Sequence, residues 1–121
     1  MKTKTVEKID TPTIYAAQNA QQGLINVNDL SLLLGVDPGR LNRFAKTGSM
    51  GHYGEYHGKR FFNFQEIINW VTEPDDENEA KPVVRANLEA MLKKKTCPYS
   101  LEKSSDGNAA VKIVWKQFVQ D

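Results

Sequence analysis

Basic and amide side chains gather in one short segment of this sequence, from Pro38 to Thr47. Its apolar residues recur at a spacing that places them on one side of a helix, and these are Leu41, Phe44 and Ala45. The other side then carries cations, amides and hydroxyls but no acid. Arginine can grip guanine, and asparagine adenine, through paired hydrogen bonds in the major groove of DNA. We therefore expect base contacts from Arg40, Asn42 and Arg43, and phosphate contacts from Lys46 and Thr47.

A second basic group follows between residues 50 and 62, where glycines alternate with aromatic residues. This mixture predicts a two-stranded hairpin, or wing, with a flexible tip. His57, Lys59 and Arg60 would then lie along the DNA backbone or in the adjacent minor groove. His52, Glu55 and His57 could be read as metal ligands, but they lack a fourth partner and have glycines between them. We expect no metal and no cofactor.

No catalytic motif stands out. The sequence has no phosphate-binding glycine-rich loop ending in Gly-Lys-Ser/Thr, no Cys-x-x-Cys, no His-Glu-x-x-His and no Gly-x-Ser-x-Gly. Its single cysteine, Cys97, has no histidine nearby in sequence, and an isolated cysteine is usually a small buried residue. We expect a protein that is not an enzyme.

The charges are segregated along the chain, although the net charge is only +1. Residues 38–60 hold five cations and one anion, whereas residues 73–82 hold five anions and one lysine. The basic segment is therefore a local feature that the total conceals. The most apolar run is too short to cross a bilayer, and one cysteine agrees with a reducing compartment, so a cytoplasmic protein without a membrane partner is expected.

Three helices are predicted around these basic groups. Asn28 can cap a first helix that ends at Gly35, and Asp37 followed by Pro38 can start a second one. Only two residues separate the first helix from the second cap, which favours a helix-turn-helix. A third helix begins at Asn63 and continues with a stripe of apolar residues, Phe64, Ile67, Ile68 and Val71.

The rest of the chain is divided by composition. Residues 1–23 are expected to be a flexible arm, residues 24–72 the DNA-binding domain, and residues 73–82 an acidic linker. Residues 83–121 are expected to form a helix and a β-hairpin that serve dimerisation or partner binding. For residues 110–119 the pattern fits strand or helix, and the Asp106-Gly107 turn signal favours the strand. The predicted fold is α+β: a small winged helix-turn-helix with a C-terminal extension.

Several runs resemble the MerR-like winged-helix superfamily, and in style they are most similar to phage excisionases and the DNA-binding domains of phage terminase small subunits. These runs are Val27 to Val36, Leu41-Asn42-Arg43-Phe44, Lys59-Arg60-Phe61-Phe62 and Ile67-Ile68-Asn69-Trp70. The resemblance implies base reading by the second helix and backbone or minor-groove contact by the wing. It falls on the residues that their chemistry already singled out.

The resulting expectation is a double-stranded DNA-binding protein of a phage or mobile element. It would act as a transcriptional regulator or an excisionase-like architectural factor, and its partners would be its DNA site and a second copy of itself in a dimer. One alternative is the recognition subunit of a DNA-packaging terminase, in which the C-terminal helix and hairpin dock an ATP-driven motor protein or build a ring. Residues 83–121 could also bind another phage or host protein. Another alternative is a protein-interaction module on a winged-helix scaffold, against which the basic helix face argues.

Overall fold

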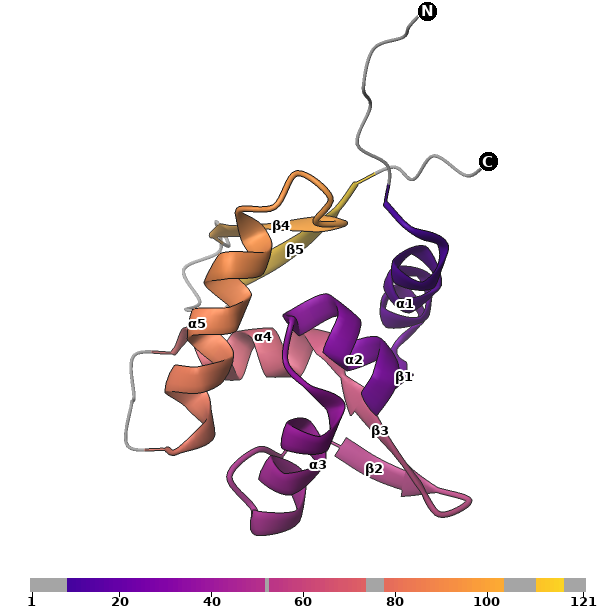
Figure 1. The fold of residues 1–121 in the computed structure, drawn as a ribbon, viewed down its shortest axis with the longest axis vertical. Coiled ribbons are helices and arrows are strands. Elements are labelled where there is room, and N and C mark those ends of the chain that lie inside the picture. The colour runs from indigo at the N-terminus through magenta and orange to yellow at the C-terminus, as the bar shows by residue number, and fades with distance from the viewer. Residues whose placement is uncertain (1–8, 52, 74–77, 104–110, 117–121) are drawn as a thin grey trace, which may run out of the picture.

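The computed structural model describes residues 9–51, 53–73, 78–103 and 111–116, and these form an α+β fold (Figure 1). Single helices or pairs of helices are followed along the chain by short antiparallel strands. In order, the elements are α1 (Thr11–Gln22), β1 (Leu24–Asn26), α2 (Val27–Leu34), α3 (Pro38–Thr47), β2 (Tyr53–Tyr56), β3 (Lys59–Asn63), α4 (Phe64–Thr72), α5 (Ala80–Leu92), β4 (Tyr99–Lys103) and β5 (Val111–Trp115).

Helices α2 and α3 follow each other closely, as the sequence predicts. Gly35 ends α2 in the left-handed conformation, at φ 71°, which costs glycine little. Asp37 caps α3 by accepting a hydrogen bond from the Arg40 amide at 3.3 Å, and Pro38 occupies the first turn. The cap of α2 is Asn26 and not Asn28, since the Asn26 side chain accepts from the Asp29 amide at 2.8 Å.

The predicted hairpin is present as β2 and β3, and β1 adds a third strand that the sequence did not indicate. All neighbours are antiparallel, in the order β1-β3-β2. Buried Phe62 lies opposite both Ile25 and Tyr53. The two residues of the hairpin loop, His57 and Gly58, both have positive φ, 52° and 76°, which matches the type I′ turn that suits a twisted two-residue hairpin.

The expected arm at residues 1–23 is wrong for residues 11–22, which form α1. Asp10 caps this helix by accepting from the Thr13 amide at 3.1 Å, and a proline stands in its first turn. Its buried face is made mostly of small residues, Thr13, Ile14, Ala16 and Ala17. Alanines give little hydrophobic periodicity, although alanine is the strongest helix former. Residues 1–8 lie outside the described part of the chain.

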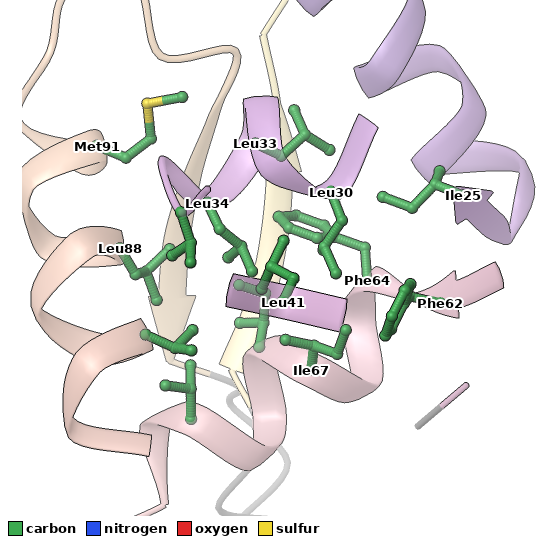
Figure 2. Packing of buried hydrophobic residues seen from close by; sticks show 14 of the residues in the cluster. Ile25, Leu30, Leu33, Leu34, Leu41, Phe62, Phe64, Ile67, Leu88 and Met91 are labelled. Atoms are coloured by element: carbon green, nitrogen blue, oxygen red, sulfur yellow. The ribbon is translucent and has the colours of Figure 1, made fainter. Parts of the chain in front are cut away.

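One hydrophobic cluster joins the helix pair to the C-terminal elements. Figure 2 shows side chains of α2, α4 and α5 meeting between the helices. Leu30, Leu33 and Leu34 of α2, Ile67 of α4 and Leu88 of α5 are each at most 2% exposed. Residues 24–72 and the segment after residue 83 therefore share a core.

The acidic segment is shorter than the predicted linker at residues 73–82, because α5 begins at Ala80. Ala80 and Lys81 are buried, and the Lys81 ammonium lies 5.5 Å from the centre of the Trp70 ring. Favourable cation–π contact allows this lysine to be buried at the start of the helix. Residues 74–77 lie outside the described residues.

The predicted C-terminal hairpin is confirmed as β4 and β5, paired from Tyr99↔Trp115 to Lys103↔Val111. The proposed Asp106-Gly107 turn lies outside the described residues. Tyr99 anchors this hairpin: its hydroxyl donates to the Leu33 carbonyl at 2.5 Å, and its ring contacts Phe64 at a centroid distance of 5.2 Å. None of the helices in the described part of the chain has the length and apolar character needed to cross a membrane.

Candidate nucleic-acid interface

Helix α3 turns its cations to solvent. Leu41 and Ala45 are buried, at 0% and 2% exposure, and Phe44 lies beside them, so the opposite side of the helix faces outward. The exposed residues there are Arg40, Arg43, Lys46 and Thr47. The face has no acid, because α3 contains none. It therefore presents positively charged hydrogen-bond donors, and the Thr47 hydroxyl is the one side-chain group there that can also accept.

The Thr47 hydroxyl is already engaged with the protein. It donates to the Phe44 carbonyl at 3.3 Å and lies 3.2 Å from the Ser49 hydroxyl. This bond to the preceding turn is common for threonine near a helix end. Thr47 is exposed, but its hydroxyl helps to end the helix at Gly48, whose φ is 83°.

Asn42 differs from the other predicted base readers. It is half-buried on the side of α3 that faces the hairpin, and its Oδ1 accepts a hydrogen bond from Arg60 Nη1 at 3.2 Å. Arginine can only donate, so this contact fixes which end of the amide faces Arg60. The structure therefore groups Asn42 with the hairpin and not with Arg40 and Arg43.

Arg60 is held between the hairpin and α3. Its guanidinium lies 5.5 Å from the centre of the Tyr53 ring. The Tyr53 hydroxyl in turn donates to the Ala45 carbonyl of α3 at 3.4 Å. Arg60 Nε is buried and has no hydrogen-bond partner among the described residues. Two neighbouring side chains of the hairpin thus each form a polar link to α3.

The tip of the hairpin extends away from the core, on the same end of the molecule as α3 (Figure 1). His57 and Lys59 are exposed there. Tyr56 is 51% exposed, and its ring contacts Phe61 at a centroid distance of 5.7 Å. The tip therefore offers two basic side chains and an exposed aromatic ring.

A cleft of about 400 Å³ separates the start of α2 from α3 and the hairpin. Its lining residues are Asn26, Val27, Asn28, Asn42, Glu55, Gly58, Lys59 and Arg60. Glu55 is the acid of this lining, and it stands opposite Arg60 in the β2–β3 ladder. The cleft is thus rich in amides and of mixed charge, whereas the outer face of α3 is purely cationic.

The structure divides the predicted site residues into an outer group on α3, a group at the hairpin tip, and a contacting pair between the two. Arg40, Arg43, Lys46 and Thr47 share the outer face of α3, and His57 and Lys59 lie at the hairpin tip, whereas Asn42 and Arg60 contact each other between them. Sequence analysis did not include Tyr53, Asn26 and Asn28 among the site residues, although Tyr53 contacts Arg60 and the two asparagines line the cleft. Strand alternation could have found Tyr53, since it shares the inward side of β2–β3 with Phe62.

The described residues contain no group of three or more His, Cys, Asp or Glu side chains placed to hold a metal ion. Of the three residues weighed as ligands, His52 lies outside the described part of the chain. Comparison of the chain with models of protein families, with curated proteins and with solved structures finds no match.

Proposed function

We propose that this chain binds double-stranded DNA and that α2, α3, the β2–β3 hairpin and α4 constitute a winged helix-turn-helix. The observation that carries the proposal is the acid-free outer face of α3, with Arg40, Arg43 and Lys46 exposed. The exposed hairpin tip with Lys59 lies at the same end of the molecule (Figure 1). The order of these elements along the chain is that of a winged helix.

In this function α3 enters the major groove, which at about 12 Å is wide enough for a helix. Arg40 and Arg43 contact base edges and phosphates from the exposed side, and Lys46 holds phosphate near the last turn. The hairpin tip follows the backbone or the adjacent minor groove with His57 and Lys59. The resemblance to phage excisionases supports a regulator or architectural factor of a phage or mobile element, acting as a dimer on its site.

Selection of bound fragments from random duplex DNA tests this proposal and supplies a site for quantitative work. Arg43→Ala should then weaken binding to the selected site by about 1 to 3 kcal/mol, because a paired contact with a base is lost. Lys59→Ala should weaken binding to all duplexes alike and lower the slope of log K against log salt by about 1.

Lys112→Ala is the matched control. Lys112 is an exposed lysine on β5, which lies at the other end of the molecule from α3 (Figure 1). The variant should keep the affinity and the salt slope of the unmodified chain. If Arg43→Ala and Lys59→Ala both left duplex affinity unchanged, or if the unmodified chain bound no duplex even at low salt, the proposal would be refuted.

A further inference from the structure

Arg60 is placed differently from every other basic residue of the candidate interface. Arg40, Arg43, Lys46 and Lys59 are exposed, whereas Arg60 is half-buried. Its guanidinium donates to Asn42 and lies over the Tyr53 ring. A cation that already has these two contacts has less of its surface left for a phosphate. The sequence expectation that Arg60 contacts DNA therefore needs revision.

The contact with Arg60 also determines what Asn42 can offer. Paired recognition of adenine needs the amide oxygen as acceptor and the amide nitrogen as donor. In the structure the oxygen, Oδ1, accepts from Arg60 Nη1 at 3.2 Å. The opposite end of the amide is its NH₂ group, and Asn42 lines the cleft beside Asn28 and Lys59. Because an amide oxygen has two lone pairs, this bond fixes the orientation of the Asn42 amide without using up the oxygen's capacity to accept.

The charge of the cleft also disfavours a phosphate contact by Arg60. Glu55 lines the cleft and lies opposite Arg60 in the β2–β3 ladder. A carboxylate there repels a phosphate that approaches Arg60, whereas it leaves the outer face of α3 unaffected. Among the residues that line the cleft, Lys59 at the tip is the cation placed for a phosphate.

We propose that Arg60 is a positioning residue of the DNA site: its bond to Oδ1 holds the Asn42 amide in one orientation, and Asn42 contributes to sequence discrimination only in that orientation. This inference rests on the proposed function, because it assigns roles within that site. Arg60 then acts on sequence discrimination through Asn42 and does not contribute a phosphate contact of its own.

The test compares two quantities for each variant on the selected duplex: the salt slope, and the ratio of affinities for the selected and a scrambled site. Arg60→Lys keeps the charge but loses the planar fork that faces Asn42 and stacks on Tyr53. It should keep the salt slope while the affinity ratio falls about tenfold. Lys59→Ala should show the reverse, a lower slope with the ratio kept.

Asn42→Ala should lower the affinity ratio as much as Arg60→Lys does, and the double variant should lose no more than either single variant, because the two residues act as a unit. An Asn42→Ala variant that keeps the full affinity ratio would overturn the inference, because Asn42 would then make no contribution to sequence discrimination for Arg60 to position.

Two further outcomes overturn the inference alone. One is an Arg60→Lys variant that keeps the full affinity ratio, as a simple phosphate contact would. The other is an Arg60→Gln variant that lowers the salt slope by about 1, as Lys59→Ala does. If the unmodified chain has no affinity for any duplex, the proposed function fails first, and that result is distinct from both.

Discussion

Replacing Tyr99 by phenylalanine removes one hydroxyl group whose partner lies in a different part of the chain. That hydroxyl donates to the carbonyl of Leu33 at 2.5 Å, and Tyr99 is only 1% exposed. Leu33 lies in the last turn of α2, where carbonyls have no partner within the helix. In Tyr99→Phe, therefore, a buried carbonyl loses the hydrogen bond that satisfies it.

The size of the effect follows from this burial. A hydrogen bond contributes about 0.5 to 1.5 kcal/mol net, and a buried acceptor left without a partner costs about 1 to 3 kcal/mol. The aromatic contacts with Phe64 and Trp115 do not involve the hydroxyl and remain. We expect Tyr99→Phe to lower the free energy of unfolding by about 2 kcal/mol, which corresponds to a fall in Tm of about 8 °C for a chain of this size.

Urea unfolding followed by circular dichroism measures this change. The midpoint should fall by about 1 M at an unchanged m-value. Tyr15→Phe is the control, because Tyr15 is 58% exposed and removal of its hydroxyl should change the free energy by less than about 0.5 kcal/mol. If Tyr99→Phe were as stable as the unmodified chain, the hydroxyl would not be what links the C-terminal hairpin to α2.

Three more predictions concern stability. Burial raises the pKa of Tyr99 above its usual 10.0 and the pKa of the Cys97 thiol above 9.0, so both groups favour the folded state while protonated. The free energy of unfolding should therefore fall as the pH rises above these values, and it should fall less in Tyr99→Phe. His57→Asn should raise it by about 0.5 to 1 kcal/mol, because Asn-Gly suits a turn with two positive φ angles, and His57→Val should lower it in the same urea assay. Asp37→Ala should lower it by about 1 kcal/mol through loss of the α3 cap, and an unchanged urea midpoint would contradict that role.

Local signals made much of this fold predictable. The Asp37-Pro38 start of α3 and the Asn63 cap of α4, which accepts from the Glu66 amide at 3.0 Å, depend on residues close in sequence. The period of the buried residues in α4 and α5 was equally clear. By contrast, α1 was missed because its buried face consists mostly of small residues, and β1 because three residues are too few to show alternation.

The polar links between elements could not be predicted. Asn42 and Arg60 are 18 residues apart, and Tyr99 and Leu33 are 66 apart. Sequence analysis can identify a side chain as a donor or an acceptor, but the partner depends on how the hairpin packs against α3. For this reason the outward placement of Arg40, Arg43 and Lys59 could be predicted, whereas the contact between Asn42 and Arg60 could not.

The common core also bears on how the chain acquires its structure during synthesis. Tyr99 and Trp115 pack on Phe64, and Tyr99 holds the end of α2, immediately before the turn into α3. While a ribosome still covers β5, these contacts cannot all form, and the leucines of α2 lack part of their apolar cover. The helix pair should therefore acquire its final rigidity only after Trp115 has emerged, so that nascent chains arrested earlier would be open to proteolysis and to chaperone capture.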